Sequence, residues 1–422
     1  MILEYSFENF LSFKEQVYFS MLTPGSKVKN RFPYNYVNWS DSYDINKVAV
    51  IVGENAGGKS NFIKSLKYFK SFFEENGNVS SRRYTLNSNM IQDTCPKNSI
   101  TTQKFHIILT GKQNQIFEYD LEIDYCGIAF ESLYLRNNKN TKPLLVFKLE
   151  RNEVKTECFD AHCDHKKCNV NISNSSDIEV NENFLSSGIK TALENNMDQN
   201  DSIGLFVTKL AIVGCEPAIQ FTKHIINSIS AEFNTKSYDI YKKCMNDHED
   251  IEILKDERYL DIFKQIDYSI SKIEIDEEDP FIKTKIHRKN ENGNSLITEL
   301  IDDSSGVCEF FAWAIQIFKV IYQDKTILVD EMDSVLNPIL SNRIVSYING
   351  SEHKGQFIFT THNVLHLDLK KYMKEQIYFV TKDPSTLESE MYSLSEFADI
   401  RYETTKIYDL YLKGILGGTA SE

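Results

Sequence analysis

The sequence predicts an α/β fold with a parallel core sheet, an antiparallel sheet beside it and an inserted helical segment. First, the apolar run Val48–Val52 is followed by a glycine-rich turn and then by a helical pattern. Second, strand and helix patterns alternate between residues 326 and 360, which is typical of parallel βαβ units. Third, strand-like runs recur between residues 104 and 149 with glycines at the turns.

The composition is that of an ordinary soluble globular protein with more than one structural unit. The chain has 422 residues, of which 41% are hydrophobic and 26% charged. No apolar run is as long as a membrane span, the first residues do not form a signal peptide, and eight cysteines lack a small-domain framework. We therefore expect a cytoplasmic protein with no membrane partner. The net charge of −14 argues against non-specific nucleic-acid binding by the whole surface, although a local basic groove stays open.

The first 46 residues precede the apolar run. Residues 1–22 alternate between apolar and polar, with a turn near Lys14, so they predict a β-hairpin or two short strands. Residues 23–46 show little periodicity and predict a loop that leads to the first core strand.

The glycine-rich turn is the strongest motif in the chain. Gly53-x4-Gly58-Lys59-Ser60 matches the phosphate loop, and it has the preceding strand and the following helix that this motif requires. The helix is indicated by apolar residues on one face, namely Phe62, Ile63, Leu66, Phe69 and Phe73. Backbone N–H groups of such a loop and the helix N-terminus bind a polyphosphate, while the lysine reaches the β- and γ-phosphates and the serine binds Mg²⁺. The candidate nucleotide-binding residues are Gly53, Glu54, Asn55, Ala56, Gly57, Gly58, Lys59, Ser60 and Asn61.

The middle of the chain separates into strands and helices. Strand-like runs at 104–109, 115–123, 128–135 and 144–149 predict an antiparallel sheet. Residues 183–265 have a helical pattern and predict an inserted helical lobe. We therefore divide the chain into residues 1–150, an N-terminal lobe; 151–270, the mainly helical insertion; and 271–422, a C-terminal lobe.

The C-terminal lobe is predicted to complete the core sheet. Strand signals occur at 271–275, 281–287 and 296–301, and a long amphipathic helix is predicted over residues 307–322. Strands follow at 326–329 and 356–360, with a further periodic segment at 339–348 between them.

Two of these strands end in polar side chains that suit nucleotide chemistry. Asp330 follows strand 326–329 and can hold Mg²⁺, while the next residue, Glu331, can act as general base toward the attacking water. Strand 356–360 leads to His362, which can sense the γ-phosphate if the two strands lie side by side. Lys59, Glu331 and His362 are therefore the candidate catalytic residues.

A third anion-binding segment precedes the long helix. Ser304-Ser305-Gly306 stands at the predicted helix N-terminus, where backbone N–H groups bind anions. A simple helix cap is the alternative interpretation of these residues.

A cluster of soft ligands lies between the antiparallel strands and the helical segment. Cys158, His162, Cys163, His165 and Cys168 could bind a structural Zn²⁺. Their spacing does not match a standard pair of zinc ligands, so a polar loop with incidental cysteines is the favoured interpretation.

The order of these motifs is similar to that of the ABC-type ATPase heads. The whole chain resembles the AAA15/AAA21 group of prokaryotic ATPases, relatives of the RecF, Rad50 and SMC heads and of the ATPase half of OLD nucleases. The resemblance is carried by the segments 9–14, 53–60, 304–306, 330–333, 360–363, 376–380 and 411–414. It implies an ABC-type head that binds ATP and Mg²⁺ and forms a homodimer or higher oligomer, in which Ser305 and Gly306 contact the ATP of another subunit.

The sequence departs from the group's usual pattern at two positions. Val307 stands where Thr is common, and Asn337 stands where His is common, in a segment that would cross the dimer interface. The glutamine of the Q-loop is not assigned, because both Gln92 and Gln103 are candidates.

The resemblance also favours one biological role over two others. Members of this size commonly work in phage defence beside a separate nuclease, so we expect an ATPase that controls such an effector. The alternative is a RecF-like clamp that grips DNA when ATP binds, for which Lys242-Lys243 is the first basic patch to test. A scaffold that holds ATP without hydrolysis is disfavoured because Glu331 and His362 are present.

Overall fold

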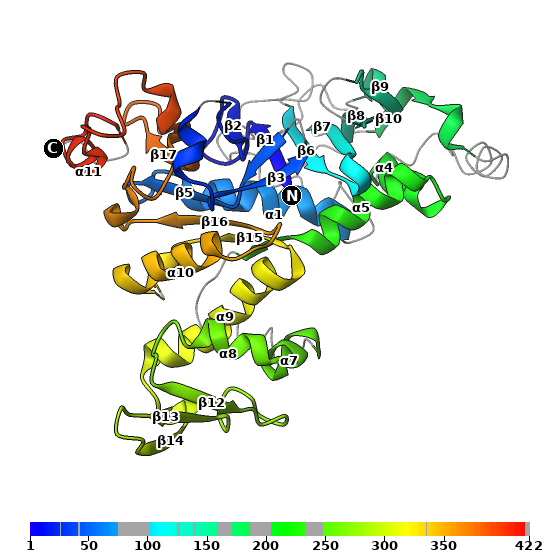
Figure 1. Ribbon diagram of the computed structural model, residues 1–422. Coiled ribbons are helices and arrows are strands. Elements are labelled where there is room, and N and C mark those ends of the chain that lie inside the picture. The colour runs from blue at the N-terminus through cyan, green and yellow to red at the C-terminus, as the bar shows by residue number, and fades with distance from the viewer. Residues whose placement is uncertain are drawn as a thin grey trace.

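The fold is described from a computed structural model of the chain (Figure 1). It describes residues 1–25, 27–40, 43–74, 102–124, 127–137, 141–157, 171–185, 204–232, 248–334 and 336–417. Figure 1 shows an antiparallel sheet at the top, a mainly parallel sheet in the middle and helices below it. The predicted α/β class, with a parallel core and an antiparallel sheet beside it, is confirmed.

The core sheet brings together strands from both ends of the chain. Its order is β11-β15-β16-β5-β17-β18, and all neighbouring strands are parallel except the β17–β18 pair. The bounds are β5 (Val48–Gly53), β11 (Ile229–Glu232), β15 (Thr326–Val329), β16 (Gln356–Thr361), β17 (Ile377–Lys382) and β18 (Ser389–Ser393). The predicted strands at 48–52, 326–329 and 356–360 therefore lie next to one another.

Both faces of the core sheet are covered, which explains why its strands are apolar throughout. Alternate residues of β5 point to opposite faces: Ala49 and Ile51 join the cluster around α1 (Lys59–Glu74). Val48 and Val50 join the cluster around α9 (Ser305–Gln323) and α10 (Pro338–Gly350). A strand that is buried on both faces has apolar side chains at successive positions, which explains the continuous apolar run in the sequence.

The second large sheet is antiparallel and packs on the other side of α1. Its order is β10-β9-β8-β7-β6-β1-β2. The bounds are β1 (Ile2–Glu8), β2 (Val17–Ser20), β6 (Gln103–Thr110), β7 (Ile116–Asp124), β8 (Gly127–Arg136), β9 (Leu144–Glu157) and β10 (Asn171–Val180). Aromatic rings of β1 and β2 pack on the α1 residue Phe62, whose ring centroid lies 5.1 Å from that of Phe19 and 6.2 Å from that of Tyr5. The predicted antiparallel strands are all present.

The helical segment differs from the expected single lobe. Helices α4 (Phe206–Ile212) and α5 (Glu216–Ser228) pack against each other, and α5 also packs on α1, beside the antiparallel sheet. Helices α7 (His248–Lys255) and α8 (Glu257–Phe263) pack against α9 instead. Strand β11 lies between these two helix pairs in the chain and joins the edge of the core sheet. The expected boundary at residue 150 falls inside strand β9. The helices therefore serve two different cores.

A small sheet precedes α9 in the chain. It lies beside the end of α9 that is farther from the core sheet (Figure 1). It contains β12 (Ile270–Glu274), β13 (Lys285–Lys289) and β14 (Ser295–Glu299) in antiparallel order. The strand expected at 281–287 is shifted toward its C-terminal side, because residues 279–283 form a turn in which Lys283 N–H donates to the Asp279 carbonyl.

The remaining elements are short. Residues 23–46 contain a hairpin of β3 (Tyr36–Ser40) and β4 (Tyr43–Asn46), where the sequence predicts only a loop, and α11 (Ile407–Leu412) follows the core sheet. Among the described helices, α9 alone has the length and apolar content of a membrane span, and 72% of its most apolar window is buried inside the protein. That burial is the arrangement of a core helix.

Candidate nucleotide-binding site

The glycine-rich loop lies at the C-terminal end of β5 and leads directly into α1. Gly53 passes so close to β17 that an added Cβ would lie 2.2 Å from the Val380 carbonyl oxygen, so only glycine fits there. Asn55 and Ala56 are exposed at the loop tip, and Ala56 has a positive φ of 61°. The Gly57 N–H donates to the Glu54 carbonyl at 3.2 Å, which closes the loop. The local structure is thus a strand, a tight loop and a helix N-terminus, as the motif requires.

The loop is braced from outside by two serines, Ser12 of the 9–14 segment and Ser389, to which the sequence analysis assigned no role. Ser389 of β18 donates to the Gly57 carbonyl at 2.6 Å, and its hydroxyl oxygen lies 2.7 Å from that of Ser12. Asn61 of α1 donates to the same Ser12 hydroxyl at 2.8 Å. Gly58 has a φ of 120°, and an added Cβ would lie 2.5 Å from the Ser389 hydroxyl. The brace therefore fixes the loop conformation and also requires glycine at this position.

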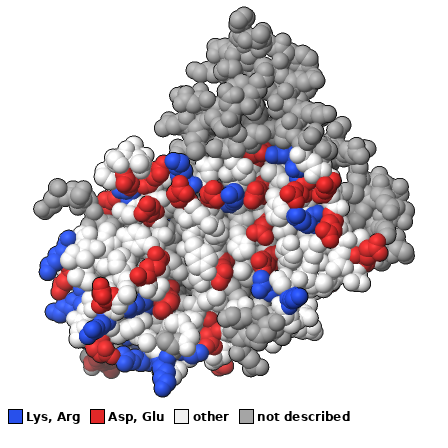
Figure 2. Space-filling model, turned by 90° about the horizontal axis from the view of Figure 1, so that it is seen from above, with Lys and Arg blue, Asp and Glu red and all other residues white. Residues whose placement is uncertain are grey.

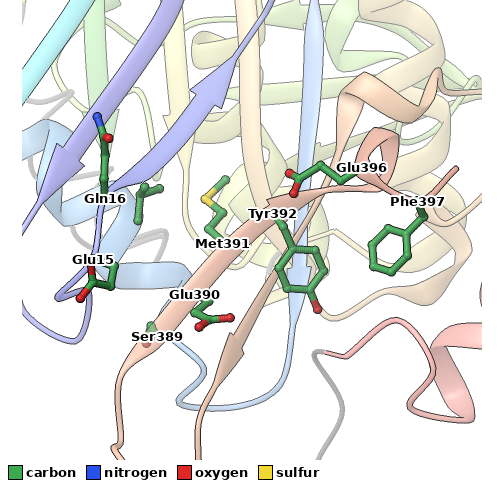
Figure 3. A pocket seen from close by; sticks show the side chains of 9 residues that line it. Glu15, Gln16, Ser389, Glu390, Met391, Tyr392, Glu396 and Phe397 are labelled. Atoms are coloured by element: carbon green, nitrogen blue, oxygen red, sulfur yellow. The ribbon is translucent and has the colours of Figure 1, made fainter.

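A surface pocket of about 470 Å³ lies beside this brace, between the turn before β2 and strand β18 (Figure 3). It is lined by Glu15, Gln16, Val17, Ser389, Glu390, Met391, Tyr392, Glu396 and Phe397. Because three of these side chains are glutamates, the pocket disfavours phosphate groups. The glycine-rich loop, and not this pocket, is therefore the candidate site for phosphate binding.

Lys59 is folded onto the loop that precedes it. Its ammonium donates to the Gly53 carbonyl at 2.9 Å and to the Glu54 carbonyl at 2.8 Å. Burial lowers the pKa of Lys59 to about 8, although the carboxylates of Asp330 and Glu331 act in the opposite direction. Because β16 alone lies between β5 and β15 in the parallel sheet, the lysine and the end of β15 lie at the same edge.

The end of β15 presents two carboxylates with different environments. Asp330 is buried and accepts a hydrogen bond from the Thr360 hydroxyl of β16 at 2.6 Å. The Glu331 N–H donates to the same hydroxyl at 2.8 Å, and Glu331 has a positive φ of 51°, which turns the chain sharply after the strand. The Glu331 side chain is exposed. Asp330 is therefore fixed, whereas Glu331 is free to face a ligand.

His362 lies in the same site, directly after β16. The side chain is exposed, and partial desolvation together with the nearby Lys59 lowers its pKa. The carboxylates of Asp333 and Glu331 act on it in the opposite direction. The structure thus brings His362, Lys59 and the acidic pair together at the carboxyl edge of the core sheet, where ligands of α/β proteins bind.

Ser60 of the loop and Asp330 at the end of β15 supply donor groups that suit a metal ion. Ser60 is in the first turn of α1 and is partly exposed, and the buried Asp330 supplies a carboxylate. A hydroxyl and a carboxylate are hard oxygen ligands, which is the donor set that Mg²⁺ prefers when phosphate oxygens complete its shell. The residues predicted to hold Mg²⁺ therefore have suitable chemistry.

Ser305 and Gly306 lie at the N-terminus of α9 and share no described contact with the glycine-rich loop of their own chain. Ser304 caps this helix by accepting from the Val307 N–H at 3.4 Å. The segment before it is anchored because Arg288 of β13 donates to the Asp303 carboxylate at 2.6 Å. Ser305 is exposed, so an anion of another molecule can reach the helix N-terminus.

The remaining predicted residues are placed as follows. Asn337 caps α10, accepting from the Ile339 and Leu340 N–H groups at 3.1 and 3.0 Å, so it substitutes for histidine without loss of a helix cap. Gln103 is buried and donates to the Asn9 carbonyl at 2.9 Å. Gln92, Lys242-Lys243 and the cluster of Cys158, His162, Cys163, His165 and Cys168 lie outside the described residues.

Sequence reasoning missed the residues that support the site rather than form it. Ser389 carries no motif signal, and Thr360 stood inside the 360–363 segment without an assigned role, because a hydroxyl beside a strand is common in any sheet. Asp333 stood inside the acidic motif without an assigned role. These contacts depend on which strands are neighbours in the sheet, and the sequence alone does not show that.

Comparison with known proteins gives one family match. Residues 221–368 match the model of the family described as AAA domain, putative AbiEii toxin, Type IV TA system. This segment contains Ser305, Glu331 and His362 but not the glycine-rich loop. The match bears out the resemblance to the AAA21 group. No curated protein matches the chain.

Solved structures of SMC heads are also similar to this chain. The SMC head domain from Thermotoga maritima is 15% identical, with 93% of this chain and 98% of that chain covered and a TM-score of 0.43. An SMC head bound to the C-terminal winged-helix domain of ScpA is 13% identical, with coverage of 93% and 97% and a TM-score of 0.40. An SMC head with an extended coiled coil, bound to the C-terminal domain of ScpA derived from Pyrococcus furiosus, is 14% identical, with coverage of 93% and 96% and a TM-score of 0.40.

Proposed function

We propose that this chain, an AAA21-type protein with an ABC-type head, binds and hydrolyses ATP and thereby controls a separate effector protein. The observation that carries the proposal is the meeting of Lys59 with Asp330, Glu331 and His362 at one edge of the core sheet. These are the groups that phosphoryl transfer to water requires: a phosphate-binding cation, a metal-binding carboxylate, a base and a γ-phosphate contact.

Each residue has a separate task in the proposed reaction. Lys59 leaves the Gly53 and Glu54 carbonyls and binds the β- and γ-phosphates, while the loop N–H groups and the α1 N-terminus bind the remaining oxygens. Glu331 orients the attacking water and takes its proton. His362 contacts the γ-phosphate. Ser60 and Asp330 would hold Mg²⁺, which would supply positive charge beside the phosphates.

The site of one chain is completed by a second copy. Ser305 is exposed and Gly306 partly exposed at a helix N-terminus with no described contact to the loop of their own chain, which supports a role in trans. In a homodimer with ATP between the subunits, these N–H groups bind the γ-phosphate held by the partner's loop. ATP binding then controls assembly, and hydrolysis reverses it.

The proposal is tested with two site variants. In Lys59→Ala we expect loss of ATP binding by titration calorimetry, because the phosphate-binding cation is gone. In Glu331→Gln we expect ATP to bind while turnover falls by about 10²–10⁴-fold, because the base is lost. ATPase activity that survives in Glu331→Gln, or a wild-type protein that does not bind ATP, would refute the assignment.

The proposed biological role is antiphage defence in a prokaryotic cytoplasm, with a nuclease as the effector. The family description, which names a putative toxin of a toxin–antitoxin system, supports a role in which the ATPase restrains or releases a harmful activity. The test is plating efficiency of phage on cells that carry the chain with its neighbouring genes. Protection should be lost in Lys59→Ala, and protection without any nuclease gene would contradict the proposed effector.

The second candidate is a RecF-like clamp that binds DNA when ATP closes the dimer. In Figure 2, acidic side chains are spread over the described part of the visible face, and the basic side chains, several of them toward the lower left, are interspersed with them. With the net charge of −14, this surface disfavours phosphate contacts. DNA binding that requires ATP and weakens steeply as salt rises would favour the clamp over the effector-controlling ATPase.

A further inference from the structure

Asp333 lies two residues after Glu331 and binds the segment that carries His362. Its carboxylate accepts from the Thr361 hydroxyl at 2.5 and 2.7 Å. It also accepts from the backbone N–H groups of His362 at 2.5 Å and Asn363 at 3.1 Å. Hydrogen bonds to an ionised acceptor are short and about twice as strong as neutral ones. The position of the His362 backbone is therefore set by a side chain from another strand end.

The same segment is held at a second place, on its far side. The Asn363 amide donates to the Ser341 hydroxyl at 3.3 Å, and that hydroxyl lies 3.0 Å from Nε2 of the buried His366. Nδ1 of His366 lies 2.8 Å from the Tyr372 hydroxyl. Because these groups are packed and hydrogen-bonded, the far side of the segment after β16 has little freedom. The other side, next to His362, is held by Asp333.

The His362 side chain itself has no such support. It is exposed, and no hydrogen bond is described for its ring, although it interacts electrostatically with Lys59 and the acidic residues. Its direction toward a γ-phosphate therefore depends on its backbone. A displacement of about 1 Å at a catalytic group is enough to cost roughly 100-fold in rate.

We propose that Asp333 is a positioning residue for ATP hydrolysis, acting by holding the His362 backbone beside the γ-phosphate site. The inference rests on the proposed ATPase function and adds to it a residue that contacts neither the nucleotide nor the water. The proposed role rests on the acceptor oxygens of Asp333, although its carboxylate also acts electrostatically on Lys59 and His362. Asp333 also connects the segment directly after the base Glu331 to the segment that carries His362. The relative positions of Glu331 and His362 are therefore fixed.

The first part of the test compares two substitutions at this position. Asp333→Ala removes every acceptor, and we expect kcat to fall by about 10–100-fold while KM for ATP changes little, because the glycine-rich loop is untouched. Asp333→Asn retains an oxygen that can accept from the two N–H groups, so it should restore most of kcat. If Asp333→Asn were as slow as Asp333→Ala, the negative charge would be what matters, and the positioning role would be refuted.

The second part asks whether Asp333 acts through His362. In a double-mutant cycle, Asp333→Ala should cost less than about twofold further once His362 is Ala, since the group it positions is gone. Independent, multiplying effects of the two substitutions would overturn the proposal.

The matched control is Asp276→Ala. Asp276 also accepts from two backbone N–H groups, those of Glu278 at 3.1 Å and Asp279 at 2.8 Å, but it lies in the turn after β12. It should lose comparable thermal stability and keep wild-type kcat. An active wild type with unchanged Asp333→Ala overturns this inference alone, whereas a wild type that does not hydrolyse ATP overturns the proposed function and the inference with it.

Discussion

At the scale of single residues, the site depends on a lysine that is hydrogen-bonded to its own loop. The Lys59 ammonium donates to the Gly53 and Glu54 carbonyls, which replace part of its hydration. Burial still lowers its pKa to about 8. The motif in the sequence predicted which residue binds phosphate, but it could not predict this titration, since that depends on how deeply the loop buries the ammonium.

The lowered pKa of Lys59 predicts a pH dependence of ATP binding. Phosphate stabilises the charged ammonium, so the pKa in the complex is higher than about 8 and binding takes up a proton above that pH. We expect the Kd for ATP to rise by up to about tenfold per pH unit above pH 8. Titration calorimetry between pH 7.5 and 9.5, in buffers of different ionisation enthalpy, measures both the affinity and the proton uptake.

Lys59→Arg is the control, because a guanidinium stays charged throughout this range. Its affinity should be weaker than that of the wild type, owing to the larger group, and independent of pH. A wild-type Kd that does not change between pH 7.5 and 9.5 would show that Lys59 is not the titrating group.

At the scale of elements, the site is formed by adjacent strand ends. Because β5, β16 and β15 are parallel neighbours, the glycine-rich loop, His362 and the acidic pair emerge at one edge. The sequence predicted the three strands and their polar ends correctly, since apolar runs of this length are strong signals. It did not reveal that α4 and α5 pack beside α1 while α7 and α8 pack on α9, because helical periodicity shows an apolar face but not its partner.

The contact between β5 and β17 gives a prediction at this scale. In Gly53→Ala, the added Cβ would lie 2.2 Å from the Val380 carbonyl oxygen, so the two strands must separate. We expect a loss of about 1–3 kcal/mol in the free energy of unfolding, as in other overpacked cores. Urea unfolding without nucleotide measures it.

Gly350→Ala is the matched substitution. Gly350 ends α10 and has no heavy atom within 4 Å of an added Cβ, so alanine should be neutral or stabilise by up to about 1 kcal/mol. Equal effects of the two substitutions would contradict the close contact at Gly53.

At the scale of the whole molecule, the proposed site takes residues from two copies of the chain. Ser305 and Gly306 lie at the N-terminus of α9, which follows the small sheet. No contact is described between this helix end and the glycine-rich loop of the same chain. The resemblance named in the sequence analysis implies that a second copy supplies it. Periodicity and spacing within one chain could not have given this, because they contain no information on what lies opposite an exposed helix end.

Complementation between two inactive variants tests this arrangement. Lys59→Ala removes the phosphate-binding lysine, and Ser305→Arg blocks the helix N-terminus, so each homodimer should be inactive. In a mixed dimer, the intact Lys59 of one subunit faces the intact Ser305 of the other, which restores one of the two sites. An equal mixture should therefore recover roughly a quarter of the wild-type ATPase rate, since half of the randomly paired dimers are mixed and each has one intact site.

Two measurements decide the outcome of that mixture. With Glu331→Gln to prevent turnover, ATP should give a species of twice the 48.9 kDa chain mass by light scattering, and Ser305→Arg should prevent it. A mixture without any recovered activity would argue against composite sites, provided that light scattering shows mixed dimers. Full activity of Ser305→Arg alone would place the γ-phosphate contact within one chain, and the dimer would then not be needed for hydrolysis.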